Sequence, residues 1–119
     1  MPYVYVQFPE LKDFIAYLKT QNINTVGIVE RVNRRTTKSG IPVARYYFRL
    51  TAKDERHKEI VLCDITYYDG GDLPMDNEHV QKPRKEVEED IERAFAEEAA
   101  KGIMFNRIKA EFTLKPITV

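Results

Sequence analysis

Basic side chains gather between residues 31 and 49, where six Lys and Arg residues occur without a single Asp or Glu. Side chains that neutralise phosphates gain affinity for nucleic acid by releasing condensed counterions, and arginine also stacks on bases. In the alternating run 42–53, Tyr47 falls on the same face as Arg45 and Arg49, so an aromatic ring lies between two phosphate-binding groups. The sequence therefore predicts an interface for single-stranded DNA or RNA formed by Arg31, Arg34, Arg35, Lys38, Arg45, Tyr47 and Arg49.

Acidic side chains are concentrated elsewhere, although the 19 basic and 19 acidic residues of the chain cancel in total. Eleven of them lie between Asp69 and Glu98, against four basic residues in the same stretch. Two alternatives to nucleic-acid binding follow from this segregation. The basic charges are simply solvated on an exposed hairpin, or the chain is a self-assembling or protein-interaction module whose basic hairpin contacts an acidic helix, giving a homo-oligomer.

A third hypothesis concerns metal chemistry in the loop that follows residue 68. Asp69, Asp72 and Asp76 are weak candidate ligands for a hard cation such as Mg²⁺, which prefers oxygen donors. A metal-dependent nuclease would use such a site, but the spacing matches no EF-hand loop. No phosphate-binding or dinucleotide-binding glycine motif occurs, so no catalytic residue and no cofactor is predicted, and the leading hypothesis is a non-enzymatic protein.

The elements that must position the basic stretch follow from hydrophobic periodicity. Apolar residues three and four apart predict helices over about 10–20 and 83–101, the second beginning at Pro83. Alternation and β-branched residues predict strands over about 3–8, 25–33, 42–53, 58–68 and 104–115, with a turn at Thr37–Gly40 and a loop at 69–81. The apolar run from Ile60 to Ile65 indicates a central strand covered on both faces, and Asp64 is its one polar exception.

The fold class that these elements predict is α+β, in the order β-α-β-β-β-α-β, with a curved antiparallel sheet and two flanking helices. A chain of 119 residues suits a single domain covering 1–119. No apolar run is long enough to span a membrane, and the lone Cys63 forms no internal disulfide, so a cytoplasmic protein is expected.

The stretch from Val26 to Ala44 resembles the first two strands of OB-fold nucleic-acid-binding domains, in particular the OB domain near the carboxyl terminus of bacterial replicative DNA polymerase α subunits. The shared pattern is a Gly-x-Val strand, an Arg-Arg-Thr-Thr-Lys-x-Gly hairpin and an x-Pro-x-Ala start to the next strand. The resemblance covers about 40 residues and implies a five-stranded barrel that binds single strands on the exposed face of strands two and three.

The same resemblance implies that Arg34, Arg35 and Lys38 lie in the loop between those strands, and Arg45, Tyr47 and Arg49 on the binding face. Features that depart from the family pattern include the turn Lys53–His57, which has no glycine, and Asp64, which stands where the family tends to carry an aromatic or apolar residue. An open antiparallel sheet flanked by two helices is therefore the alternative to a closed barrel.

Overall fold

The computed structural model describes residues 2–109 and contains five strands and two helices. Their order along the chain is β1 (Val4–Phe8), α1 (Leu11–Thr20), β2 (Thr25–Thr36), β3 (Pro42–Asp54), β4 (Glu59–Gly71), α2 (Glu78–Ala100) and β5 (Asn106–Ile108). The strands form one sheet in the order β1-β4-β3-β2-β5. The α+β class and the element order predicted from the sequence are confirmed.

The sheet is mixed, which corrects the prediction of an antiparallel sheet. β2·β3 and β3·β4 are antiparallel hairpins, whereas β1 pairs with β4 in parallel and β5 pairs with β2 in parallel. The physical reason is that α1 carries the chain from one edge of the sheet to β2, and such a crossover joins strands without the reversal of a tight turn.

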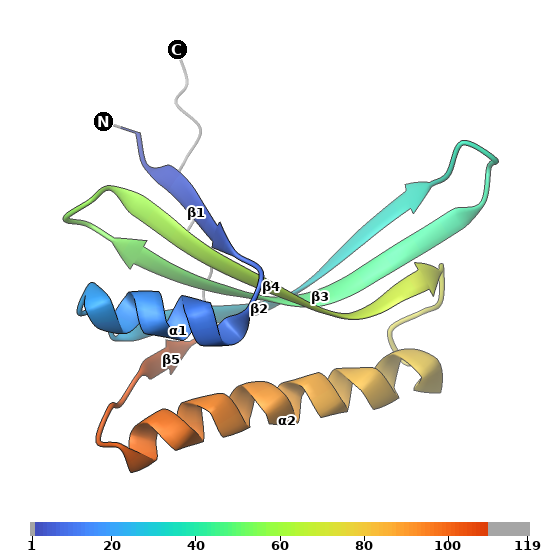
Figure 1. Cartoon of the computed structure of the whole chain (residues 1–119). Coiled ribbons are helices and arrows are strands. Elements are labelled where there is room, and N and C mark those ends of the chain that lie inside the picture. Colours follow the sequence, from blue (N-terminus) through green and yellow to red (C-terminus); the bar gives the residue numbers. More distant parts are fainter. Residues whose placement is uncertain (1, 110–119) are drawn as a thin grey trace.

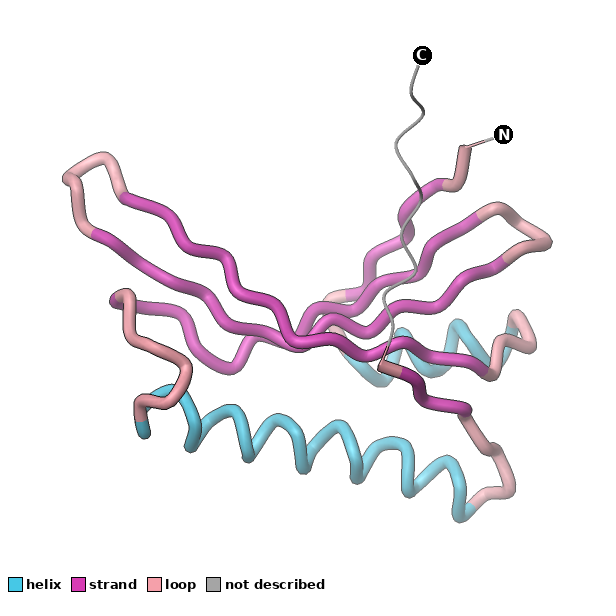
Figure 2. The backbone as a smooth tube through the Cα atoms, turned by 180° about the vertical axis from the view of Figure 1, so that it is seen from behind, coloured by secondary structure: helices cyan, strands magenta, loops and turns pink. Residues whose placement is uncertain are grey.

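A closed barrel is not formed, because β1 and β5 lie at opposite edges of the sheet and do not pair. The sheet instead bends into an open V, with α1 and α2 both beneath it (Figure 1). Seen from behind, the β2–β3 hairpin forms one limb of the V, and β1 with the β3–β4 hairpin forms the other (Figure 2). Residues 31–46, which form the projecting hairpin limb, are called the arm below.

The hydrophobic core lies between the sheet and the two helices. Phe14 and Leu18 of α1 and Ile91 and Phe95 of α2 pack against buried residues of the strands. The strands contribute Val26, Ala44, Tyr46, Phe48, Leu50, Ala52, Val61 and Cys63. The alternation predicted for β3 is therefore confirmed: its even-numbered residues 44–52 face the helices, and the intervening residues face the opposite side. That opposite side of the sheet is called the open face.

The segment leading into α2 differs from its prediction. β4 extends to Gly71 and α2 begins at Glu78, so the loop predicted over 69–81 shrinks to 72–77, and Pro83 lies inside the helix. Asn77 is the reason for the early start, since its side-chain oxygen accepts a hydrogen bond from the His79 backbone N–H at 2.8 Å. Val80 in this first turn is fully buried, which fixes the helix against the core.

β4 carries one irregularity, a β-bulge opposite the Tyr46–Tyr47 bond of β3. Tyr46 is paired with Tyr68 and Tyr47 with Thr66, so Tyr67 is an extra residue. Both Tyr67 and Tyr68 pack their rings near Tyr46, at centroid separations of 6.2 and 5.9 Å. The strand predicted over 104–115 is described only as β5, Asn106–Ile108, and the rest of it from residue 110 lies outside the described residues.

Candidate nucleic-acid interface

The centre of the open face is a stack of three side chains along β3. The guanidinium carbons of Arg45 and Arg49 lie 4.4 and 5.7 Å from the ring centroid of Tyr47. Tyr47 lies between the two arginines on the same face of the strand. Tyr47 is only 6 % exposed as a result. A cation over an aromatic face is attracted by the negative charge of the ring face. The planar surfaces offered to a ligand are therefore those of the guanidinium groups, and the tyrosine ring serves as their support.

Arg49 is neutralised by a carboxylate on the neighbouring strand. Its Nε and a terminal nitrogen donate to the two oxygens of Asp64 at 2.8 and 2.9 Å, and the residues are register partners across β3 and β4. Gln7 of β1 donates a further, longer hydrogen bond of 3.4 Å to Asp64. Asp64, whose direction the sequence periodicity leaves open, thus lies on the open face as the partner of Arg49. This pair orients Arg49 and removes most of its net charge.

Arg45 is held differently from Arg49. Its Nε atom is buried and has no hydrogen-bond acceptor among the residues that the structure describes. Its register partner on β4 is Asp69, an exposed residue. A buried donor without an acceptor is costly, so the Arg45 guanidinium is less fully satisfied than that of Arg49.

The basic residues of β2 lie on different faces of the sheet. Arg31 and Arg35 are register partners of Tyr47 and Val43, so both belong to the open face. Arg34 and Arg35 lie within β2 and not in the connecting loop that the OB-fold resemblance implies, because β2 continues to Thr36. Arg34, between Arg31 and Arg35, lies on the helix side. One of its terminal nitrogens donates to the Tyr46 hydroxyl at 2.8 Å, and its Nε donates to Asp72 at 3.2 Å. The Tyr46 hydroxyl in turn donates to the Leu73 carbonyl at 2.7 Å, so Arg34 ties the arm to the segment before α2.

Lys38 lies at the exposed tip of the arm, in the turn between β2 and β3. The structure therefore brings Arg31, Arg35, Arg45, Tyr47 and Arg49 together on one face, places Lys38 at its far end and directs Arg34 away from it. Asn33, the register partner of Arg45, is a polar open-face residue that the sequence reasoning missed. The alternation of β2 indicates this position, because residues 31, 33 and 35 lie on the same face of a strand.

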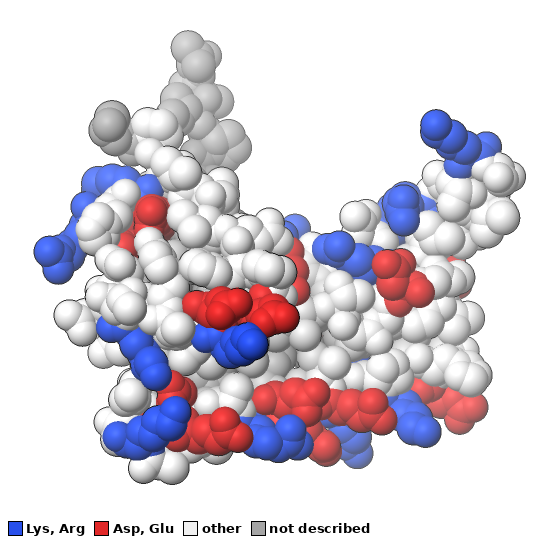
Figure 3. All heavy atoms as spheres, viewed as in Figure 1, with Lys and Arg blue, Asp and Glu red and all other residues white. Residues whose placement is uncertain are grey.

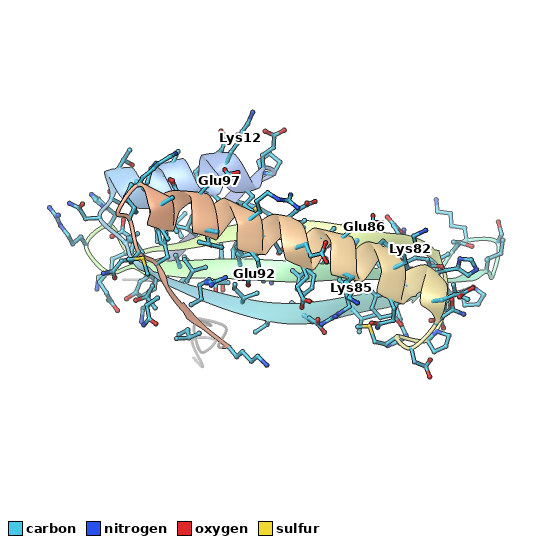
Figure 4. The ribbon with its side chains drawn as sticks, turned by 90° about the horizontal axis from the view of Figure 1, so that it is seen from below. Lys12, Lys82, Lys85, Glu86, Glu92 and Glu97 are labelled. Carbon is cyan, nitrogen blue, oxygen red and sulfur yellow. The ribbon has the colours of Figure 1, made fainter. Side chains whose placement is uncertain are left out.

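Figure 3 shows how the charges are distributed on one side of the molecule. Lys and Arg occupy the tip of the arm, and Asp and Glu form a band along α2. Figure 4 shows Lys82, Lys85, Glu86 and Glu97 along α2, seen from below. The segregation of charge in the sequence is thus a separation in space between the arm and α2.

The candidate metal ligands do not form a cluster. Within residues 2–109, no group of three or more His, Cys, Asp or Glu side chains is placed to hold a metal ion. Asp69 lies near the end of β4, Asp72 is engaged with Arg34, and Asp76 is exposed in the loop before α2.

Neither described helix is long and apolar enough to cross a membrane.

A groove of about 760 Å³ lies on the helix side, between β2, α2 and β5. Its walls include Ile28, Phe48, Ile91 and Phe105, and Glu30 meets Arg84 within it. The Arg84 guanidinium also lies 5.6 Å from the Phe48 ring centroid. The ion pair joins the middle of β2 to α2 and occupies the polar part of the groove.

Comparison of the chain with protein-family models, curated proteins and solved structures finds no match. The functional argument therefore depends on the geometry of the chain itself.

Proposed function

We propose that the protein is a non-enzymatic nucleic-acid-binding module that takes a single strand of DNA or RNA along its open face and arm. The observation that carries the proposal is the stack of the Arg45 and Arg49 guanidinium groups on the Tyr47 ring. Guanidinium planes are surfaces on which unpaired bases stack, and their N–H groups bind phosphate and base acceptors.

The proposed roles of these residues differ because their surroundings differ. Arg35 and Lys38 are exposed on the arm, where they contact the phosphate backbone. Arg45 supplies a stacking surface and a hydrogen-bond donor, whereas Arg49 supplies surface alone because Asp64 balances its charge. Arg34 has a positioning role, since it holds the arm through Tyr46 and Asp72. This assignment refines the sequence-based hypothesis, in which all of the arginines contact phosphate and Tyr47 stacks on bases.

A single strand is favoured over a duplex because stacking on the guanidinium groups requires bases that are free of their partners. The open V of the sheet is consistent with the same choice, since neither helix covers its concave side (Figure 1).

The proposal is tested by fluorescence anisotropy with a labelled single-stranded oligonucleotide and its duplex, across a salt series. We expect tighter binding of the single strand and an affinity that falls as salt rises. Each phosphate contact removed lowers the slope of log K against log salt by about 0.7 for single strands. The double substitution Arg35→Glu plus Lys38→Glu should therefore weaken binding and reduce the slope by about 1.4.

The matched control is Lys82→Glu plus Lys85→Glu, which changes the net charge equally on α2 (Figure 4). We expect this variant to bind as the unmodified protein does. Arg45→Lys keeps the charge but removes the planar group, and it should reduce the preference for the single strand over the duplex. Absence of binding at low salt, or an equal loss in the α2 control, would overturn the proposal.

A further inference from the structure

The outer edge of β2 is unoccupied over most of its length among residues 2–109. β5 pairs only with Thr25–Gly27, so no described strand lies beside residues 28–36. A sheet edge of this length presents a row of backbone donors and acceptors that favours pairing with another strand.

The direction of the backbone groups identifies which residues present them. The Asn24 carbonyl accepts a hydrogen bond from the Asn106 N–H at 2.6 Å, so residue 24 points toward the β5 side. The register of β2 with β3 is unbroken from Gly27 to Thr36, and backbone groups alternate in direction along a regular strand. The even-numbered residues therefore direct their N–H and C=O groups outward, and Val32 lies at the middle of this free edge.

The opposite edge of the sheet is less suited to pairing. β1 has only five residues, Val4–Phe8, and Pro2 and Pro9 flank it. Proline and short length are the usual means of blunting an edge strand. β2 has twelve residues and no proline.

We propose that the β2 edge pairs in antiparallel fashion with the β2 edge of a second copy, about a two-fold axis that passes through Val32. In this register Glu30, which also pairs with Arg84, lies opposite Arg34 of the other copy, which also pairs with Asp72. Arg31 lies opposite Asn33. Opposite charges across an antiparallel pair are stabilising and like charges are destabilising. Because β5 occupies the edge only as far as Gly27, residues 28–36 can take part in this pairing.

Charge excludes the neighbouring registers. Facing residues must point to the same face of the sheet, so a two-fold axis normal to the sheet passes through a residue and its own copy. An axis through Arg31 places the two Arg31 side chains together, and an axis through Asn33 places Arg31 against Arg35. An axis through Glu30 places the two Glu30 side chains opposite each other, and an axis through Arg34 does the same for Arg34. The Val32 register is the one that avoids every like-charge pair, and it places the 41 % exposed Val32 against its copy.

This symmetry has a consequence for the rest of the molecule. A two-fold axis normal to the sheet leaves the open faces of both copies on the same side and makes one continuous sheet. The contact differs from one between the arm and an acidic α2, and it does not depend on nucleic-acid binding.

The first test is disulfide cross-linking of Val32→Cys. Facing α-carbons in a hydrogen-bonded antiparallel pair are about 5.5 Å apart, within the range of a disulfide. In the matched control Thr36→Cys, the two cysteines are eight positions out of register, roughly 27 Å apart at about 3.4 Å per residue. The native Cys63 is buried, and burial raises the pKa of its thiol to about 12, so it does not compete.

We expect cross-linked dimer for Val32→Cys, none for Thr36→Cys, and a mass of twice 13.9 kDa for the unmodified chain by sedimentation velocity. Val32→Lys places two like charges across the axis without altering the backbone, and it should restore the monomer, whereas Val4→Lys on the β1 edge should not. Oligonucleotide affinity separates this test from the proposed function, because Val32→Lys removes no proposed contact.

Three results would overturn the inference. One is a monomeric unmodified protein at high concentration, and another is equal cross-linking of the two cysteine variants. The third is a dimer that survives Val32→Lys but is lost in Arg35→Glu plus Lys38→Glu, since that result assigns self-association to the arm and the acidic helix.

Discussion

The two turns at the ends of β3 differ in how their charges are balanced. In the β3–β4 turn, Asp54 accepts hydrogen bonds from the backbone N–H groups of Arg56 and His57, and Glu55 contacts Lys53 and Lys58. The β2–β3 turn is closed by hydrogen bonds between Thr37 and Ile41, with distances of 2.9 and 3.1 Å, and contains no carboxylate. Both turns reverse the chain equally well, so the basic tip of the arm is not a requirement of the hairpin. A turn whose charge has no local acidic partner is the one suited to an external anion.

The largest expected effect that separates the two turns comes from Asp54→Ala. Its carboxylate is nearly buried and accepts two backbone hydrogen bonds and one from the His57 ring, with Nδ1 at 2.8 Å. Removing it should lower the free energy of unfolding by about 2 kcal/mol, measured by urea denaturation. The corresponding Thr37→Ala in the arm should cost about 0.5–1 kcal/mol, because it removes one exposed hydrogen bond. Equal costs at the two turns would contradict the comparison.

The same carboxylate predicts a difference in acid stability. Burial opposes ionisation of Asp54, but the hydrogen bonds and charge of His57 outweigh it, so the pKa of Asp54 lies below its ordinary value. A carboxyl with a lowered pKa stabilises the fold above its unfolded-state pKa of about 3.9, and this contribution is lost as pH falls through the folded-state pKa. The stability difference between the unmodified protein and Asp54→Asn should therefore be present where Asp54 is ionised and shrink below about pH 4. A difference independent of pH in denaturation series would refute this explanation.

A smaller effect is expected from backbone conformation in the arm. Gly40 has a φ of +81°, whereas Lys58 supplies the positive φ of the other turn at 54°. Gly40→Ala should cost about 1 kcal/mol through backbone strain alone, since an added Cβ meets no atom within 4 Å. Gly71→Ala is the control, because its Cβ is also unobstructed and its φ is not positive. Thermal denaturation should show a lower Tm only for Gly40→Ala.

The smallest effect on stability should come from the charges themselves. Arg35→Ala plus Lys38→Ala removes exposed side chains and should change the free energy of unfolding by less than about 0.5 kcal/mol. The same variant should lose affinity for a single-stranded oligonucleotide in the anisotropy assay. A large loss of stability would mean that these charges serve the fold of the arm.

Much of the fold could be predicted because hydrophobic periodicity reports burial directly. The alternation of β3, the helix near residues 11–20 and the interior position of the Ile60–Ile65 strand follow from side-chain patterns. The expected cover on both faces of that strand is wrong, because α1 and α2 lie on the same side of the sheet (Figure 1). The parallel pairing of β1 with β4 could not be predicted from these patterns, because the direction of a strand depends on how α1 crosses the sheet. The predicted start of α2 at Pro83 is too late, because the capping signal belongs to Asn77, the residue before Glu78.

Side-chain partners within the candidate interface were less predictable than its location. Arg34 and Arg35 are adjacent and chemically identical, yet one is bound to Tyr46 and Asp72 and the other lies on the open face. The alternation of β2 places them on opposite faces, but the partners of Arg34 come from β3 and from the segment before α2, which no local pattern encodes. Asp64 was ambiguous for a similar reason, since its partner Arg49 comes from another strand.

The bulge at Tyr67 changes the phase of β4. Before it, odd-numbered residues such as Cys63 and Ile65 face the helices, and after it the even-numbered Tyr68 does so. In a strand of uninterrupted period two, Asp69 would have pointed under the sheet toward the helices. The single inserted residue instead delivers this carboxylate to the same side as Arg45. Deleting one residue here would exchange the two sides of the last four positions of β4 and leave the far end of the open face more strongly positive.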